Sequence, residues 1–420
     1  MVSTTVVLFT RDLRVSDHPA LHAAVTEADR VVPLFVVDPA LVRVSARNRI
    51  AYLLEALAEL RGLLRERGGE LVVRQGDTVA ETVRIVAETG AQAVYLSADV
   101  SAAAVRRARQ LTEAVRAAGA HVRTFPGVTV VPPGALRPAH GDHYQIFTPY
   151  LNAWRAAQWR SPRPAPERVR LPEGLVPGPL PGAELIRLGT GVLAPQREQG
   201  GPRTARERIR AWLAQPNQDS RFGCHLHFGC LSPLEVALVA REHPRGALLL
   251  RQLALRDFHH QVLQAFPRLP RADYRPRPIQ WRDDDSAFAA WCSGRTGVPI
   301  VDAGMRQLLW EGYVPGRIRM LTATYLTQVL RIHWKRGADH FYSLLVDGDV
   351  ANNYGNWQQI AGTGGVPRPA RRINLYRQAE RYDPSGDYVR RFVPELRSIS
   401  GSAVHHPPVP RPGGYPPPLR

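Results

Sequence analysis

The stretch DGDVANNYGNWQQIAGTGG, residues 347–365, combines aspartates, asparagines, a tyrosine and a tryptophan and then runs into glycines. Charged and amide side chains are costly to bury unless hydrogen bonds satisfy them. The apolar flank FYSLLV before this stretch, together with Trp357, argues against a simple solvent-facing loop. The sequence therefore predicts that the segment holds a ligand.

Three other segments carry polar residues at positions where a helix usually has apolar core residues. In QDSRFGCHLHFG, Asp219 and Ser220 are good helix caps whose neighbouring amides can bind phosphate, although an ordinary N-cap is the simpler explanation. The paired arginines Arg317 and Arg319 can bind a buried carboxylate or a phosphate. In RQLALRDFHHQ, helical spacing puts four residues on one stripe, namely Gln252, Leu255, Arg256 and His259.

The net charge of +18 comes almost entirely from arginine, since Lys335 is the only lysine. Charge of this sign favours polyanionic partners, of which nucleic acid is the commonest, but arginine excess also follows from a GC-rich genome. The cysteines are too few and too irregularly spaced for a disulfide framework or a zinc site, and the paired histidines lack carboxylate partners, so we expect no metal. No apolar run reaches membrane-spanning length, so we expect a cytoplasmic protein without membrane contact.

Residues 1–130 alternate apolar strands with amphipathic helices. The runs TTVVLFTR, RVVPLFVVD, ELVVRQGD, AVYLSAD and HVRTFPG read as strands, and residues 47–68 and 100–119 read as helices between them. This series predicts an α/β domain with a doubly wound parallel sheet, whose ligands lie beyond the carboxyl ends of the strands. Neither a GxGxxG nor a Walker-type loop is present, so no motif identifies the ligand of this half.

The rest of the chain changes rhythm. Residues 131–202 are rich in proline and glycine and predict an interdomain linker. Residues 203–398 read as helices with few β runs, which predicts an all-α domain. Residues 399–420 form a proline-rich tail, whose end HHPPVPRPGGYPPPLR predicts disorder.

Together these pieces resemble the photolyase/cryptochrome family. After a βαβ domain opening LFTRDLRVSDHPAL, the chain shows SRFGCHLHFGCLSP, FAAWCSGRTGVPIVDAGMRQL, GRIRMLTATYL, DGDVANNYGNWQQIAGTG and RQAERYDPSGDYVRRFVPEL in that order. The resemblance covers Val6 to about Leu396 and is strongest from Trp281 onwards. It implies that the all-α C-terminal domain binds FAD.

The resemblance assigns the flavin to the segment that starts at Asp347. Asp347 and Asp349 match the family's two flavin-contacting aspartates, Asn353 matches the residue facing flavin N5, and Arg319 matches the arginine paired with the first aspartate. We therefore expect a buried Arg319–Asp347 pair, where loss of one partner costs about 3–5 kcal/mol.

The remaining flavin contacts come from earlier in the chain. The family's pyrophosphate-binding segment usually reads Thr-Ser-Arg-Leu-Ser, and only the Ser-Arg pair is kept here. The matching residues are Asp219, Ser220, Arg221, Phe222 and Gly223, with Gln252 and Arg256 as further candidates.

Trp281, Trp334 and Trp357 match the family's chain of three tryptophans, which carries electrons from the surface to a photoexcited flavin. Most tryptophans are packing residues, but a match at all three positions favours electron transfer. Removing one is then expected to block photoreduction without necessarily blocking repair.

The chain departs from the family at the lesion pocket, which receives a dimer flipped out of the duplex. Leu255 and Gln359 stand where repair enzymes have tryptophans, and Gln252 stands where they have glutamate. Each lost stacking platform is worth about 1–3 kcal/mol, so the grip on the lesion is weaker unless it is compensated. Residues that keep family identities and are expected to contact the DNA phosphate or the dimer are Arg256, Arg317 and Met320.

Three further departures concern the antenna, the substrate and a loop. The segment SAAAVRRARQ lacks the Asn-Glu pair of folate-binding members, which favours a deazaflavin antenna, or none, over folate. The neighbourhood of Gly316 lacks the paired histidines of enzymes that act on six-four photoproducts, which argues against that substrate. The stretch before Asp219 is shortened where the family carries a flavin-phosphate tyrosine and a DNA-contacting arginine.

The first interpretation is a deoxyribodipyrimidine photo-lyase, a carbon–carbon lyase that repairs pyrimidine dimers in damaged DNA with an electron from reduced, light-excited FAD. We expect it to act as a monomer. The altered pocket motivates a second interpretation, a cryptochrome-like blue-light photoreceptor that photoreduces its flavin with little or no repair. A third, a basic helical nucleic-acid-binding protein without flavin, rests on charge alone.

Overall fold

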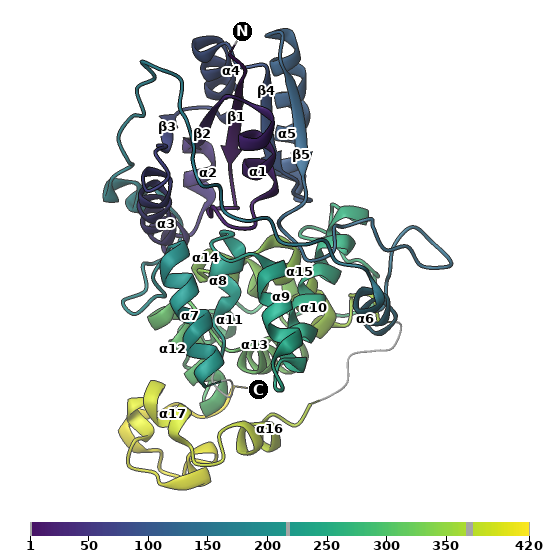
Figure 1. The fold of residues 1–420 in the computed structure, drawn as a ribbon. Coiled ribbons are helices and arrows are strands. Elements are labelled where there is room, and N and C mark those ends of the chain that lie inside the picture. The colour runs from purple at the N-terminus through teal and green to yellow at the C-terminus, as the bar shows by residue number, and fades with distance from the viewer. Residues whose placement is uncertain (1, 216–218, 367–372, 420) are drawn as a thin grey trace. The chain divides into compact units, whose positions relative to one another are not determined.

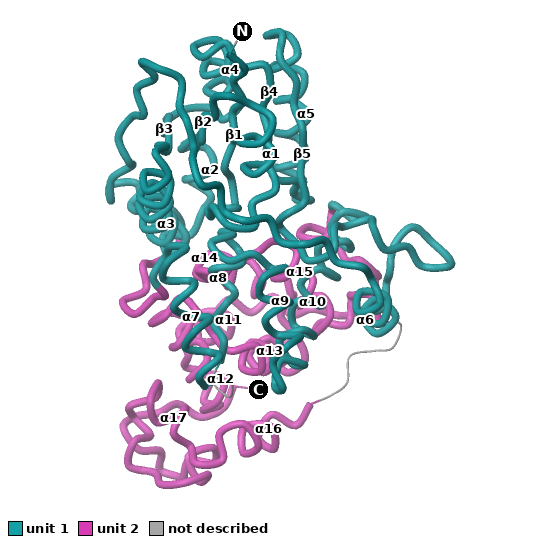
Figure 2. Tube along the Cα trace, viewed as in Figure 1, with its two compact units in different colours: residues 1–190, 199–267 teal, residues 191–198, 268–420 magenta. Residues whose placement is uncertain are grey.

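The computed structural model describes residues 2–215, 219–366 and 373–419. The chain forms two compact units, one of residues 1–190 and 199–267 and the other of residues 191–198 and 268–420 (Figure 2). The first unit holds the sheet and the helices up to residue 267, and the second is helical (Figure 1).

The first unit is built around a five-stranded sheet of order β3-β2-β1-β4-β5 (Figure 1). The strands are β1 (Thr4–Phe9), β2 (Arg30–Val37), β3 (Val72–Gln75), β4 (Ala93–Ser97) and β5 (His121–Phe125). All neighbours pair in parallel, and Val6 lies opposite Val32 on one side and Val94 on the other. The predicted doubly wound sheet is therefore confirmed.

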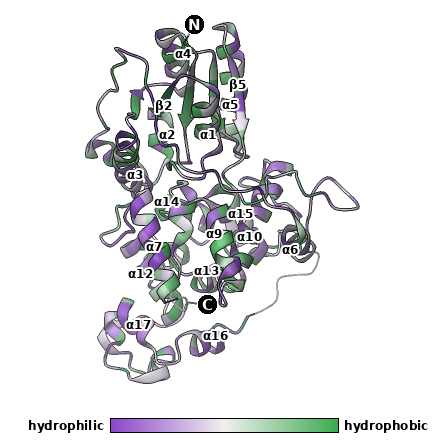
Figure 3. Cartoon of the chain, viewed as in Figure 1, coloured by the Kyte–Doolittle hydropathy of each residue, from purple (hydrophilic) through white to green (hydrophobic). Residues whose placement is uncertain are grey.

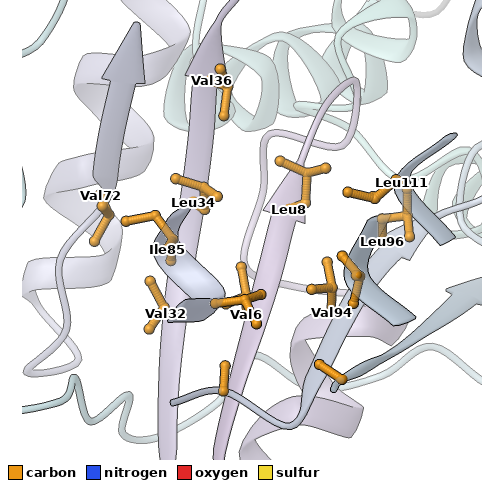
Figure 4. Packing of buried hydrophobic residues seen from close by; sticks show 14 residues of the cluster. Val6, Leu8, Val32, Leu34, Val36, Val72, Ile85, Val94, Leu96 and Leu111 are labelled. Carbon is orange, nitrogen blue, oxygen red and sulfur yellow. The ribbon is translucent and has the colours of Figure 1, made fainter. Parts of the chain in front are cut away.

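The core of this unit lies between one face of the sheet and the helices α4 (Thr78–Thr89) and α5 (Ala102–Ala117). Alternate strand residues such as Val6, Leu34 and Leu96 point to that face, where they meet Ile85 of α4 and Leu111 of α5 (Figure 4). Burial on both faces explains the nearly continuous apolar residues of β1, β2 and β4, and β2 is hydrophobic in Figure 3.

Local signals set the ends of these helices. Asp77 caps α4 by accepting hydrogen bonds from the amides of Val79 and Ala80. Gly90 ends the same helix at φ 61°, a left-handed conformation that suits glycine. The other helices before the linker are α1 (Pro19–Glu27), α2 (Pro39–Val44) and α3 (Arg47–Arg65).

Most of the predicted linker, residues 131–190 and 199–202, belongs to the first unit, whereas residues 191–198 belong to the second. The amide of Val31 donates to the carbonyl of Arg170, and the amide of Val73 donates to that of Pro177, each at 2.7 Å. The segment therefore runs extended along the strands and is held by their backbone. The helices α6 (Phe147–Ala156), α7 (Pro202–Ala214), α8 (Phe222–His227), α9 (Pro233–Glu242) and α10 (Ala247–Ala265) complete the unit.

The second unit is all helical in the part that the structure describes. Its helices are α11 (Asp285–Cys292), α12 (Pro299–Glu311), α13 (Gly316–Thr324), α14 (Trp334–Leu344), α15 (Val350–Ala361), α16 (Leu375–Tyr382) and α17 (Asp387–Phe392). Residues 316–337 do not form one continuous helix. A π-helical turn, Tyr325–Val329, follows α13, and Arg331 takes a left-handed φ of 55° before α14 begins.

The disorder predicted for the tail is wrong for its described residues, which end at position 419. The ring of Tyr415 is buried and its Oη donates to Oδ2 of Asp302 at 2.5 Å. The amide of Leu419 donates to the carbonyl of Thr296, and Tyr325 Oη donates to the carbonyl of Leu419, each at 2.9 Å. Proline-rich composition predicts an extended chain, and this chain is extended but packed.

Candidate functional site

Arg319 of α13 and Asp347, in the turn between α14 and α15, form the expected ion pair. Arg319 Nη2 donates to both carboxylate oxygens of Asp347, at 2.8 and 3.1 Å, and Nε donates to the carbonyl of Val314 at 2.6 Å. The pair is confirmed, but its burial is only partial, because the side chains keep 27% and 11% of their exposure. Solvent therefore screens it more than the sequence suggested.

Asp349 and Asn353 are placed by the first turn of α15. Asp349 is buried and caps the helix, since its Oδ1 accepts from the backbone amide and from Nδ2 of Asn352 at 2.9 and 2.8 Å. Nδ2 of Asn353 donates to the carbonyl of Ala338 in α14 at 2.9 Å. Among the described residues no donor reaches Oδ1 of Asn353, so this oxygen is available to a ligand.

Trp281 and Trp334 are joined by a histidine ring. Trp281 meets His333 edge-to-face with centroids 5.2 Å apart, and His333 lies 5.5 Å from Trp334. Burial lowers the pKa of His333, and its Nδ1 accepts from the amide of Lys335. The ring between the two tryptophans is therefore neutral at ordinary pH.

Trp357 of α15 is buried against other aromatic rings of the second unit. Its indole lies edge-to-face with Phe341 at 5.3 Å and with Trp291 at 6.0 Å. Gly337 of α14 faces the same indole, and a Cβ at this position would overlap it. The close approach of α14 to α15 thus depends on a residue without a side chain.

Trp334 is fully buried and has two polar neighbours that sequence reasoning missed. Its indole Nε1 donates to Oδ1 of Asp273 at 2.7 Å. The ring of Tyr354 meets it edge-to-face at 6.5 Å, and Tyr354 Oη donates to Oδ1 of Asp339 at 2.7 Å. No motif signals Asp273, which lies 61 positions from Trp334 in the chain.

The predicted lesion contacts of the second unit lie on α13 and α15. Arg317 is exposed, stacks on the Tyr382 ring at 4.7 Å and donates to its Oη at 2.7 Å. Met320 is half-buried, and Gln359 is exposed. These side chains lie on the same two helices that carry Arg319 and Asn353.

The remaining lesion candidates belong to α10 in the first unit. Gln252 is exposed and Leu255 is half-buried. Arg256 points inward, where Nη1 donates to the carbonyl of Val128 at 2.6 Å and Nη2 donates to that of Leu226 at 3.3 Å. The geometry therefore does not support the predicted contact of Arg256 with flavin or DNA, because its guanidinium holds the fold of its own unit.

The predicted phosphate segment begins differently from expectation. Arg221, with φ 53°, precedes α8 as its N-cap, and neither Asp219 nor Ser220 caps the helix. Instead, the guanidinium of Arg208 holds this backbone in place, because it donates to the carbonyls of Asp219 and Ser220, each at 3.0 Å. At the start of α8, Gly223 is half-buried, and Phe222 is buried and meets the ring of Trp212.

The carboxyl edge of the sheet carries a second group of charged residues. Arg11, after β1, pairs with Asp99, after β4, at 3.2 Å. Thr78 donates to Asp38, which follows β2, at 3.0 Å, and burial lowers the pKa of Arg107. The chain reverses its winding between β1 and β4, which is where such sheets bind ligands.

Among the residues that the structure describes, no group of histidine, cysteine and carboxylate side chains is arranged to hold a metal ion. No helix in that part of the chain is both long and apolar enough to cross a membrane.

Comparisons with known proteins identify the class. Residues 5–168 match the family model "DNA photolyase", and residues 249–414 match "FAD binding domain of DNA photolyase". A deoxyribodipyrimidine photo-lyase of Streptomyces griseus is 45% identical, over 97% of this chain and 92% of its own. A cryptochrome DASH of Natronomonas pharaonis is 34% identical, over 97% and 93%.

Solved structures agree. A class III photolyase from Agrobacterium tumefaciens superposes with a TM-score of 0.89 at 28% identity, covering 100% of this chain and 94% of that one. The chain therefore belongs to the DNA photolyase family, and its helical part carries the family's FAD-binding domain.

The second unit offers hydrogen-bond acceptors of the kind that the N–H and hydroxyl groups of a flavin need. Carboxylates at Asp347 and Asp349 accept from N–H and hydroxyl groups, and the Asn353 oxygen accepts from a protonated ring nitrogen. Arg319 keeps the Asp347 carboxylate in place and balances its charge. All of these residues lie within residues 249–414, the segment that matches the FAD-binding domain.

Proposed function

We propose that the protein is a deoxyribodipyrimidine photo-lyase that repairs pyrimidine dimers in damaged DNA with light and FAD. The observation that carries the proposal is the Arg319–Asp347 pair beside Asp349 and Asn353, inside the segment that matches the FAD-binding domain of DNA photolyase. The Streptomyces griseus relative, similar over nearly the whole chain, supports the same activity.

The protein's part in the reaction is to bind, orient and shield. Reduced FAD, when bound, supplies the light-excited electron that opens the dimer. Asp347 and Asp349 orient the ring edge, and Asn353, tied to α14 through Nδ2, keeps its oxygen in one place. The segment from Asp219 to Gly223 binds the pyrophosphate, with its backbone held by Arg208.

Trp357, Trp334 and Trp281 form a relay that carries an electron from the protein surface to the photoexcited flavin. Trp357 and Trp334 are buried, and Trp281 is half-buried, which is the order expected of a path that leads outwards. His333 lies against two of the three rings and is neutral, so it adds no charge that would repel a positive hole.

Damaged DNA is bound through arginine and through the exposed side chains of the lesion pocket. Arg317 contacts a phosphate, Met320 and Leu255 contact the dimer, and the amides of Gln252 and Gln359 hydrogen-bond thymine carbonyls. The basic charge of the chain adds a salt-dependent attraction to any duplex. We propose a monomer in the cytoplasm, with either a deazaflavin antenna at the Arg11–Asp99 edge of the sheet or no antenna.

The test of this proposal is flavin content followed by selective binding. Purified protein is expected to carry FAD, or to take it up on reconstitution, and to bind an oligonucleotide with one thymine dimer more tightly than the undamaged oligonucleotide at the same salt. Arg317→Ala should weaken binding of the damaged and of the undamaged oligonucleotide about equally, because it removes a phosphate contact. Colourless protein that gains no flavin would contradict the proposal.

A second candidate, a blue-light photoreceptor, is favoured by one observation. Gln252 and Gln359 are exposed amides, and Leu255 is a half-buried aliphatic residue, where repair enzymes place a carboxylate and aromatic platforms. The photoreceptor predicts flavin photoreduction without any preference for damaged DNA. A clear preference in the binding measurement decides against it.

A further inference from the structure

The middle tryptophan of the relay is bound by an uncompensated carboxylate. Trp334 keeps 1% of its exposure, and its Nε1–H donates to Oδ1 of Asp273 at 2.7 Å. Among the described residues no arginine or lysine lies within salt-bridge distance of Asp273. The negative charge of Asp273 is therefore directed at the indole rather than at a basic side chain.

The second carboxylate near this ring is different. Asp339 reaches Trp334 only through Tyr354, whose Oη donates to it and whose ring meets the indole edge-to-face. Asp339 is also paired with Lys335, one helical turn earlier in α14. Its charge is thus balanced, so Asp273 is the stronger electrostatic influence on Trp334.

A carboxylate in this position matters when the indole is oxidised. Once Trp357 has lost an electron, Trp334 passes one electron to it and is left with one positive charge. A hydrogen bond from a positively charged N–H to a carboxylate is stronger than one from a neutral N–H. The Asp273 carboxylate therefore stabilises the oxidised form of Trp334 more than the resting form, which makes this step more favourable.

We propose that Asp273 is a positioning residue of the relay, which draws the positive charge from Trp357 onto Trp334 and opposes its return, until Trp281 passes one electron to Trp334 and a thiol in solution returns one electron to Trp281. This inference rests on the proposed function, since the oxidant is the light-excited flavin of that proposal. The proposed relay thus consists of three tryptophans and one carboxylate, and the carboxylate stabilises the positive charge on Trp334.

The hydrogen bond itself is tested without flavin. In protein labelled with ¹⁵N-tryptophan, the Nε1–H resonance of Trp334 is identified by its loss in Trp334→Phe. Asp273→Asn keeps an acceptor of the same shape but removes the charge, so the resonance should move upfield, and Asp273→Glu should leave it closer to the wild-type position. Asp283→Asn, on a carboxylate that keeps 96% of its exposure, is the control and should leave it in place.

The role in electron transfer is tested by light. Oxidised holoprotein is illuminated with a thiol present, and the rate of flavin reduction is followed by absorbance. Asp273→Asn should lower the rate roughly threefold or more, Asp273→Glu should restore most of it, and Asp283→Asn should leave it unchanged. Dimer repair by protein that was reduced chemically beforehand should be the same for every variant.

The outcomes separate the two claims. Photoreduction of Asp273→Asn at the wild-type rate would overturn the role of Asp273 while leaving the proposed function intact. Wild-type protein that carries flavin but is not photoreduced would overturn the relay and, with it, this inference. An unmoved Trp334 resonance in Asp273→Asn would show that the hydrogen bond is absent in solution.

Discussion

At the scale of single residues, the site is defined by which polar atoms are already engaged within the protein. Arg319 and Asp347 hold each other, Asp349 caps its helix, and Asn353 is tied to Ala338 by its amide nitrogen. Arg256 donates to a backbone carbonyl of its own unit, whereas Arg319 pairs with a carboxylate, so the two arginines have different roles. Function at this scale follows from the partners rather than from the residue types.

Breaking the Arg319–Asp347 pair should cost less than a deeply buried pair. Asp347→Asn is expected to lower the free energy of unfolding by about 1–3 kcal/mol, between the values for surface and buried pairs, because Arg319 remains partly solvated. Flavin content should fall with it. Chemical denaturation measures the first effect, and the absorbance ratio of flavin to protein measures the second. Asp283→Asn serves as the surface control, and an equal loss in both variants would contradict the prediction.

Trp357 should be needed for photoreduction but not for repair. Trp357→Phe keeps an aromatic ring against Phe341 and Trp291 but is much harder to oxidise, so illumination with a thiol should leave the flavin oxidised. Chemically reduced Trp357→Phe should still repair dimers. Trp310→Phe, at an exposed tryptophan of α12, is the matched control. Photoreduction of Trp357→Phe at the wild-type rate would exclude this residue from the relay.

Sequence reasoning reached these residues unevenly. The Arg319–Asp347 pair agrees with what the family resemblance implies, whereas the electron-transfer roles of Trp334 and Trp357 stay predictions. The bond from Trp334 to Asp273 could not be predicted, because it joins a helix to a loop through contacts that no periodicity records. The inward turn of Arg256 was missed for the same reason, since helical spacing gives a stripe but not the carbonyls that face it.

At the scale of elements, the close packing of α14 and α15 positions the site. Asn353 and Trp357 lie on α15. Asn353 donates to the carbonyl of Ala338 on α14, and the ring of Trp357 lies against Gly337 of the same helix. The strands and the helices expected at residues 47–68 and 100–119 were predictable because apolar runs and helical periodicity are local signals. The π-helical turn after α13 and the packing of the tail were not, because both depend on distant partners.

Adding one methyl group between these helices should disturb the relay. Gly337→Ala places a Cβ against Trp357 and Leu326 and is expected to destabilise the protein by about 1–3 kcal/mol and to slow photoreduction. Gly316→Ala is the matched control, since open space surrounds that position in α13 and alanine favours a helix by up to about 1 kcal/mol. Thermal unfolding of both variants checks the contrast. Gly337→Ala as stable as Gly316→Ala would show that the helices can separate at little cost.

The tail should stabilise the second unit in a pH-dependent way. Burial raises the pKa of Asp302 above its ordinary value of 3.8, while the hydrogen bond from Tyr415 opposes that rise. Tyr415→Phe removes the bond and so raises the folded-state pKa further, which destabilises only the ionised form. The loss should be about 1–3 kcal/mol at neutral pH and should shrink as the pH falls towards the unfolded-state pKa.

Unfolding in denaturant at pH 7 and near pH 4 measures this difference. Tyr376→Phe, whose ring stacks on His406, is the control for loss of a tyrosine hydroxyl in the same unit. The sign follows from the proton balance, because the folded state with a raised Asp302 pKa binds more protons and loses stability as the pH rises. An equal loss at both pH values would contradict a role for the Asp302 charge.

At the scale of the whole molecule, a basic chain with a helical FAD-binding domain and a doubly wound sheet matches one family along its length. Family membership was predictable because many short segments occur in a fixed order, each weak alone. The affinity for the lesion was not predictable from the sequence, because it depends on how exposed side chains such as Gln252 and Gln359 contact a substrate.

The most direct test of the account is light-dependent restoration of a thymine dimer. Protein is reduced chemically, mixed with an oligonucleotide that carries one dimer, and illuminated with blue light, with a dark sample and oxidised protein as controls. Restored thymines should accumulate with illumination time in the reduced, illuminated sample only. Reduced protein that carries flavin and binds the oligonucleotide but restores no dimer would contradict the account and favour a photoreceptor.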